Sequence, residues 1–291
     1  MSVGRAAWWF IAPALLVIGV FFLLPAAASF LLSLTDFDLY ALADPLNLRW
    51  VGFDNYTELL QRPLFWQAMG NTLYFVIVGV PLSILVSLSA AVLLQDAAAR
   101  ATAFFRTALF APVVTTVVAV AVIWRYLFHT RYGWINYALD GIGIGPVDWL
   151  GDPQWAMPTL ILFAVWKNFG YNMIILLAGL QAIPTDLYEA ARIDGANRWQ
   201  QFRHITLPGL QPMLLMVAIL TTAGYFQLFA EPYVITEGGP VQSTLSVLYL
   251  MFEEGFKWWN LGMASAVAFT LFAMMLTVTL LLSRLAGRAH P

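Results

Sequence analysis

Six long apolar runs constrain the fold of this 291-residue chain more than any other feature. A helix needs about 17–25 apolar residues to cross the hydrocarbon core of a bilayer, and every run is long enough. The runs are Trp8–Leu34, Ala68–Leu94, Thr107–Trp124, Ala156–Leu180, Leu210–Ala230 and Trp259–Ser283. Five contain no charged residue, and the fourth contains only Lys167. The pattern predicts an all-α, polytopic membrane protein with six transmembrane helices.

Composition supports a bilayer as the solvent and excludes several kinds of chemistry. Hydrophobic residues make up 61% of the chain and charged residues only 10%, whereas soluble domains carry about 25% charged residues. The absence of cysteine excludes disulfides, thiolate metal sites and cysteine nucleophiles. Because the chain has no basic stripe, we expect no nucleic-acid partner.

The distribution of Lys and Arg predicts the orientation. With the N-terminus inside, eight of these residues lie on the inner side and five on the outer side. Positive residues prefer the cytoplasmic side, so both termini are predicted to be cytoplasmic. The outer loops are then about 33, 31 and 28 residues long, which predicts short helices within them.

The start of the chain has a second interpretation. Arg5, the apolar run and Pro25–Ala28 resemble a secretory signal with a small-residue cleavage site. However, the run extends to Leu34 and exceeds the apolar core of a signal, which is about 7–15 residues long. We therefore favour an uncleaved first span.

The segment between the fourth and fifth spans predicts two short helices joined at a glycine. Asp186 is placed to cap the first helix, and Glu189 to complete a capping box three residues later. Gly195 suits the left-handed residue that ends a helix. We expect Pro208 to stop the second helix, and Pro212 to open the next span.

The second of these helices is amphipathic. Trp199, Phe202 and Ile205 recur at three-residue spacing and share one face. An exposed apolar face suits docking of a second protein. Arg192, Arg198 and neighbouring residues equally suit an interfacial helix on lipid headgroups, and physical arguments alone leave both alternatives open.

A motif favours the docking alternative. Glu189-Ala190-Ala191, Gly195, Ile205 and Leu207-Pro208 resemble, at every spacing, the EAA loop of permease subunits in ATP-binding-cassette importers. The resemblance implies that Glu189 pairs with a basic residue of an ATPase subunit. The residues expected to couple to the ATPase are Glu189, Ala190, Ala191, Asp194, Gly195, Trp199, Phe202, Ile205, Leu207 and Pro208.

Two further stretches resemble sugar permeases of the maltose and glycerol-phosphate transporter type. One is Trp166–Met173, continued by Ala178–Pro184, and the other is Thr236–Pro240, followed by Ser243-Thr244. Glu237 departs from the small residue that many members carry at its position. The likeness covers roughly residues 68–284.

The resemblance implies a type I importer fold in the bacterial inner membrane and half of a translocation pathway for a sugar, either a mono- or oligosaccharide or a sugar derivative. It divides the chain into a first helix with its outer loop (1–67), a permease core (68–284) with the coupling loop 184–208, and a tail (285–291). The implied partners are a second, non-identical permease, two ATPase subunits and an extracytoplasmic sugar-binding protein.

Sequence motifs for catalysis are missing. The only lysines, Lys167 and Lys257, do not follow glycine, so the chain has no phosphate-binding loop and ATP is expected on the partner. His129, His204 and His290 are isolated, and no two stand at metal-ligand spacing. We therefore predict no cofactor, no metal site and no catalytic residue in a subunit that is not itself an enzyme.

Polar residues in the fourth and fifth spans are candidates for the substrate pathway. An aromatic ring packs on the C–H face of a sugar while amides bond its hydroxyls. The candidates resemble positions that line the sugar site of the maltose permease subunit. They are Lys167, Asn168, Tyr171, Gly224, Gln227, Leu228 and Glu231.

The role of Lys167 is left open. Its ammonium either donates to a substrate, or pairs with a carboxylate such as Glu231, or reaches the membrane surface. We favour a structural role. A rival class for the whole chain is a self-contained secondary carrier or an intramembrane enzyme, but such carriers usually show internal repeats and several intramembrane charges. This chain shows no evident repeat.

Overall fold

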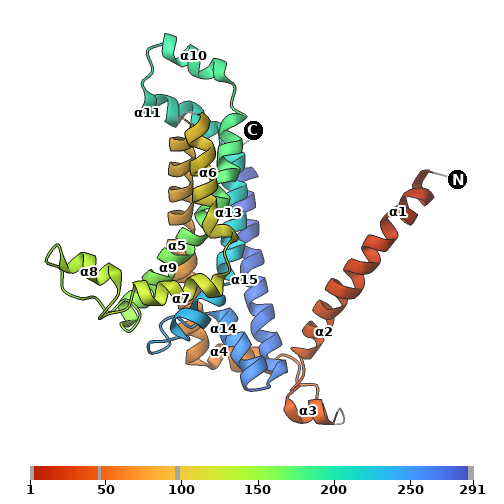
Figure 1. Cartoon of the computed structure of the whole chain (residues 1–291). Helices are drawn as coiled ribbons and strands as arrows, with labels where there is room; N and C mark the ends of the chain where they lie inside the picture. The colour runs from red at the N-terminus through yellow and green to blue at the C-terminus, as the bar shows by residue number, and fades with distance from the viewer. Residues whose placement is uncertain (1–2, 45–46, 96–98, 288–291) are drawn as a thin grey trace. The chain divides into compact units, whose positions relative to one another are not determined.

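The structure is a computed structural model that describes residues 3–44, 47–95 and 99–287. This part of the chain is helical almost throughout (Figure 1), and its only β pairing is a bridge between Thr35 and Trp50. The chain divides into two compact units, Met1–Trp66 with Leu250–Ala273 and Gln67–Tyr249 with Met274–Pro291. The predicted all-α class is confirmed.

The first unit begins with a long apolar helix. It consists of α1 (Val3–Ile18), the π turn η1 (Gly19–Leu23) and α2 (Leu24–Leu32). The most apolar 18 residues of Trp8–Leu32 have no buried member. A helix this apolar and this exposed needs lipid or another protein around it.

Polar contacts hold the rest of the first unit together. Its short helices are α3 (Leu39–Ala43), α4 (Asp54–Gln61) and η5 (Glu253–Lys257). Buried Asn55 on α4 donates through Nδ2 to the carbonyl oxygens of Ser33 and Thr35, at 2.8 Å each. These bonds satisfy the carbonyls that the end of α2 leaves free.

The second unit contains the remaining helices. They are α6 (Ala99–Val114), α7 (Val117–Leu127), α8 (Trp134–Asp140), α9 (Pro153–Gln181), α10 (Thr185–Ile193), α11 (Arg198–Gln201), η3 (Phe202–Thr206), α12 (Leu207–Gly209), α13 (Gln211–Phe226), η4 (Pro232–Thr236) and most of α5 (Pro63–Gln95). Two helices, α14 (Val247–Phe252) and α15 (Leu261–Gly287), contribute residues to both units. The short helices predicted in the outer loops are thus present.

Helix α9 is the centre of the second unit. Of its most apolar 18 residues 67% are buried, against 33% for α5. Ala91 and Leu94 of α5, Met173 and Leu180 of α9, and Val217 of α13 belong to one buried apolar cluster. Burial of both faces explains why α9 tolerates small and polar residues that a lipid-facing helix excludes.

Four helices are long and apolar enough to span a membrane, and they confirm the first, second, fourth and sixth predicted spans. The third and fifth are bent pairs. Ala103–Val114 meets Val117–Leu127 at 97°, and Arg198–Gly209 meets Gln211–Phe226 at 65°. If each pair is one span, the count reaches the predicted six. Such discontinuous helices are tolerated where protein or a cavity surrounds the break.

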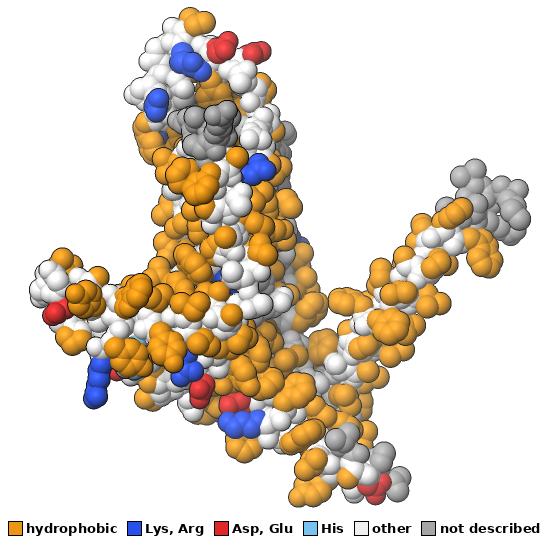
Figure 2. All heavy atoms as spheres, in the orientation of Figure 1, with side chains coloured by type: hydrophobic (Ala, Val, Ile, Leu, Met, Phe, Trp, Pro, Cys, Tyr) orange, Lys and Arg blue, Asp and Glu red, His pale blue; other side chains and the backbone are white. Residues whose placement is uncertain are grey.

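Charged and hydrophobic side chains occupy different levels along the second unit. Figure 2 shows charged side chains around the segment from α10 to α11 and again near the opposite end of the bundle, with hydrophobic side chains between. This banding is typical of a protein that crosses a bilayer. The predicted domain boundaries stay predictions. The predicted tail 285–291 begins inside α15, and its residues 288–291 lie outside the described part of the chain.

Candidate functional site

The segment between α9 and α13 is a helical hairpin, called the hairpin from here on (residues 184–209). Figure 1 shows it at the end of α9 and α13 that lies away from α7 and α8. Its first helix, α10, ends at Ile193 and is followed by Gly195, whose φ is +76°. The N–H of Ala196 donates to the carbonyl of Ala191 at 2.8 Å, and that of Gly195 to Arg192 at 3.1 Å. This pair of bonds is the Schellman motif, which favours glycine, and the predicted helix end is confirmed.

The predicted capping box on α10 is wrong. The helix begins at Thr185 behind Pro184, so Asp186 lies in its first turn and no side chain caps it. Proline at the boundary fixes φ near the helical value, and it has no N–H that needs an acceptor. A capping box is present on the second helix instead, where the side chains and backbones of Asn197 and Gln200 bond reciprocally.

The predicted stop at Pro208 is also wrong. The second helix continues through the π turn η3 and through Pro208 to Gly209. The N–H of Leu207 reaches back five residues to the Phe202 carbonyl, and this wider turn precedes the proline. Proline is accommodated in the first turn of the α-helical segment that follows, where a missing N–H costs little. Pro212 does lie in the first turn of α13, as predicted.

The hairpin is fastened to the bundle on one side only. Tyr188 Oη and Thr206 Oγ1 form a 2.9 Å hydrogen bond between its two helices. Tyr188 and Ile205 pack on the buried apolar cluster. Helix α10 has no buried residue, and Ile193 on its last turn is 87% exposed. The hairpin therefore presents an apolar surface that the described residues do not cover.

The ten predicted coupling residues are spread over both helices of the hairpin. Glu189, Ala190, Asp194, Gly195, Trp199, Leu207 and Pro208 are exposed, whereas Ala191, Phe202 and Ile205 are half-buried. The rings of Trp199 and Phe202 stack with their centroids 5.6 Å apart. Two hollows of about 390 and 350 Å³ lie on either side of His204 and Ile205.

A cavity of about 320 Å³ lies between α9 and α13. Val113 of α6 and Phe75 of α5 complete its wall. Six of the seven predicted pathway residues line it: Asn168, Tyr171, Gly224, Gln227, Leu228 and Glu231. The structure thus brings together residues of two spans that are far apart in the sequence, in a cavity of the size that small molecules occupy.

Buried hydrogen bonds hold the floor of this cavity. Asn172 is 3% exposed and donates through Nδ2 to Thr221 Oγ1 at 2.9 Å and to Ser83 Oγ at 3.3 Å. The bonds tie α9 to α13 and to α5. The sequence interpretation missed Asn172 and Thr221, although an amide inside an apolar span is itself a signal of interhelical bonding.

Tyr225 was also missed, and it carries an unusual group. Its side chain lines the cavity and is 5% exposed, yet its hydroxyl makes no hydrogen bond within the described residues. Ser83 and Asn168 are its polar neighbours, but neither meets hydrogen-bonding geometry. Buried polar groups are nearly always partnered, so this hydroxyl has an unmet hydrogen bond behind the cavity wall.

Lys167 lies beside the cavity but does not line it. Its side chain is buried, and Nζ donates to the carbonyl oxygens of Pro112 at 2.8 Å and Val113 at 3.1 Å. These carbonyls lie at the end of α6, beside the 97° break, where the Pro112 carbonyl also accepts from the backbone N–H of Thr115. The ammonium therefore caps a broken helix, an arrangement that none of the predicted roles included.

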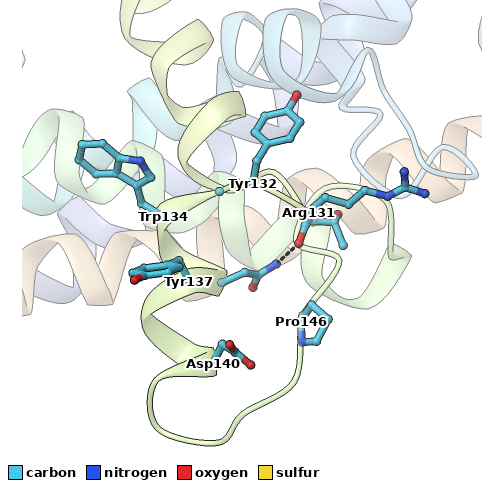
Figure 3. A pocket seen from close by; sticks show the side chains of 9 residues that line it. Arg131, Tyr132, Trp134, Tyr137, Asp140 and Pro146 are labelled. Carbon is cyan, nitrogen blue, oxygen red and sulfur yellow. Dashed lines mark hydrogen bonds between the residues drawn. The ribbon is translucent and has the colours of Figure 1, made fainter.

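A third hollow lies in the loop around α8. This hollow has a volume of about 480 Å³. Figure 3 shows the lining residues Tyr132, Trp134, Tyr137 and Asp140. Its buried amide, Asn136, is already used: Nδ2 donates to the carbonyls of Thr130 and Val147 and Oδ1 accepts from Trp149 Nε1. The hollow therefore offers aromatic rings without a convergent set of free polar groups, and the cavity between α9 and α13 is the better candidate site.

Comparison with curated proteins shows close relatives of similar length. The chain is 37% identical to the lactose transport system permease protein LacF of Rhizobium radiobacter, over 94% of this chain and 91% of the relative. It is 34% identical to the trehalose/maltose transport system permease protein MalF of Thermococcus litoralis, over 95% and 92%.

The fold is shared with solved transporters. The crystal structure of a bacterial ABC transporter involved in the import of the acidic polysaccharide alginate contains a chain that matches with a TM-score of 0.82. The match has 23% identity and covers 99% of this chain and 96% of that chain. The predicted type I importer fold is confirmed. The model of the binding-protein-dependent transport system inner membrane component family matches residues 71–290. The chain therefore belongs to the family of inner membrane components of binding-protein-dependent transport systems.

Proposed function

We propose that this chain is the sugar-translocating permease subunit of an ATP-driven importer and that the hairpin transmits the movement of separate ATPase subunits to the cavity. One observation carries the proposal: the uncovered hairpin joins α9 directly to α13, and these two helices contribute most of the cavity wall. A partner that moves the hairpin therefore moves both walls. The names of the lactose and trehalose/maltose relatives support a saccharide as cargo.

The assembly that this requires has three kinds of partner. A second, non-identical permease completes the pathway, because the lining residues of this chain do not fully enclose the cavity. Two ATPase subunits receive the hairpins, and Glu189 pairs with a basic residue of one of them. A binding protein delivers the sugar on the outer side. Both termini and the hairpin are then cytoplasmic. Nucleotide coupling requires the hairpin contact to differ in affinity between the ATP-bound and ATP-free states.

The test measures ATPase activity of the purified assembly. Glu189→Lys replaces an exposed carboxylate with an ammonium and is expected to lower sugar-stimulated ATP turnover at least tenfold, because it turns an attraction into a repulsion. Asp140→Lys makes the same change at an exposed position of α8, outside the hairpin, and is expected to leave turnover within twofold. Full turnover in Glu189→Lys would remove the coupling role.

Gly195 offers a second test that does not change charge. Because its φ is +76°, proline, whose φ is fixed near −65°, cannot adopt the Schellman end of α10. Gly195→Pro is expected to abolish ATPase association while the helices of the bundle stay folded. Co-purification of the ATPase and the circular dichroism of the permease separate these two results.

A further inference from the structure

The charge in the lining of the cavity between α9 and α13 is of one sign. Glu231 is the one charged side chain in its described lining. The other polar side chains are uncharged, and they are those of Asn168, Tyr171, Asn172, Thr221, Tyr225 and Gln227. No Lys, Arg or His of the described residues lines it.

The cation nearest to these residues in the chain is turned away. Lys167 precedes Asn168, but its Nζ is directed to the carbonyls of Pro112 and Val113. The carbonyl end of a helix carries a partial negative charge, which offsets the ammonium. Lys167 and Glu231 attract each other, but no ion pair within 4 Å joins them. Glu231 is therefore the one acidic group that a molecule in the cavity meets, with no cation among the described lining residues.

This field distinguishes between two classes of sugar. A carboxylate, sulfonate or phosphate that leaves water must find a compensating cation, and the cavity presents none. It would also meet Glu231 where the effective dielectric constant is lower than in water, so that repulsion is stronger. The hydroxyls of an uncharged sugar can instead donate to Glu231 in charge-assisted bonds.

The other lining groups suit the uncharged sugar as well. The unpartnered hydroxyl of Tyr225 is buried behind the cavity wall and can bond a sugar hydroxyl when the ring shifts toward the cavity. Gln227 is exposed to the cavity and offers both a donor and an acceptor. The exposed ring of Tyr171 supplies a face for sugar C–H groups.

We propose that the cavity selects uncharged saccharides against anionic ones, and that Glu231 is the specificity-determining residue. The proposal rests on the proposed function, because it names the class of sugar that the same cavity carries. On this proposal, the chain carries a different charge class of sugar from a permease for an acidic polysaccharide, even though the two folds are alike.

The test uses the complete transporter in liposomes, with its permease partner, ATPase subunits and binding protein. The probes are matched neutral and acidic sugars: glucose with glucuronate, lactose with lactobionate, and maltose with maltobionate. The neutral member is expected to be transported at least tenfold more efficiently. Glu231→Gln is expected to reduce this ratio about tenfold. Because the binding protein is common to both variants, a change in the ratio reports on the permease.

Two further variants test whether the charge in the cavity sets this ratio. Glu237→Gln removes an exposed carboxylate outside the cavity and is expected to leave the ratio unchanged. Gln227→Lys adds a cation to the cavity wall while Glu231 remains, and is expected to shift the ratio toward the acidic sugar. If Glu231→Gln fails to assemble, this variant decides alone.

The outcomes separate the two proposals. Equal or preferential transport of an acidic sugar by the unmodified transporter overturns the charge selectivity, as does an unchanged ratio in assembled Glu231→Gln and Gln227→Lys. If no saccharide is transported and Glu189→Lys leaves ATPase turnover intact, the proposed function itself fails.

Discussion

The ammonium of Lys167 lies 2.8 Å from the carbonyl oxygen of Pro112, near the break between α6 and α7. A charge inside a span is costly unless it is paired or wetted. Here the cost is offset by hydrogen bonds to two carbonyls at the broken end of α6. The two anomalies, a buried lysine and an interrupted helix, thus stabilise each other.

Lys167→Met keeps the length and apolar stem of the side chain but removes the ammonium. We expect a loss of about 1.5–3 kcal/mol in the free energy of unfolding, because two buried carbonyls lose a charged donor. Thermal unfolding of the detergent-solubilised protein measures this. Lys167→Arg keeps the charge and is expected to recover part of the stability. A variant with wild-type stability but raised KM for sugar would instead indicate a substrate ligand.

Gly170 is the second point at which α9 meets α6. A Cβ atom at this position would overlap the Leu109 carbonyl oxygen and come within 3.1 Å of Phe110 Cα. Gly170→Ala is therefore expected to force the helices apart and to destabilise the protein by about 1–3 kcal/mol. Gly70→Ala on α5 meets nothing within 4 Å, and its better helix propensity is expected to stabilise by up to about 1 kcal/mol. Equal effects in the two variants would contradict the close approach.

Tyr225→Phe removes the unpartnered hydroxyl and leaves the ring in place. Stability is expected to be unchanged or slightly higher, because no hydrogen bond within the chain is lost. Sugar transport is expected to show a KM raised several-fold. The two readouts are melting temperature and transport kinetics. A marked drop in stability would show that the hydroxyl has a partner in the folded chain.

Glu254 provides a pH-dependent prediction in the first unit. Its carboxylate lies 2.6 Å from Arg62, yet burial outweighs this attraction and raises the pKa of Glu254 above its usual 4.5. The folded state therefore binds this proton more tightly than the unfolded state. The stabilising contribution of the proton is complete below about pH 4.5 and is lost as pH rises through the folded pKa.

The measurement is the difference in melting temperature between the wild-type protein and Glu254→Gln as a function of pH. The melting temperature of the wild type is expected to fall relative to that of Glu254→Gln as pH rises through that window. Glu253→Gln is the matched control, since Glu253 is the neighbouring acid and pairs with Lys257 at 2.8 Å. A flat difference for Glu254→Gln would mean that Arg62 fully compensates for burial.

Much of the hairpin was predictable because its determinants are local. Gly195 is needed for a left-handed helix end whatever surrounds it, and the spacing from Glu189 to Leu207 is a property of the chain itself. The failures were local too, but they depended on register: α10 begins at Thr185, two residues before the start that the Asp186 cap requires. A shift of two residues is within the usual uncertainty of helix boundaries.

The sequence by itself determined the all-helical class, the number of apolar segments and the faces that Asn168 and Gln227 share with their neighbours. Hydrophobic length and helical periodicity are carried by single segments, so they need no knowledge of packing. Only the tertiary structure decided that the third span breaks, that Lys167 caps the break and that the Tyr225 hydroxyl is left without a partner. Each of these depends on which backbone or side-chain atoms a second helix brings within 3 Å, and no single segment encodes that distance.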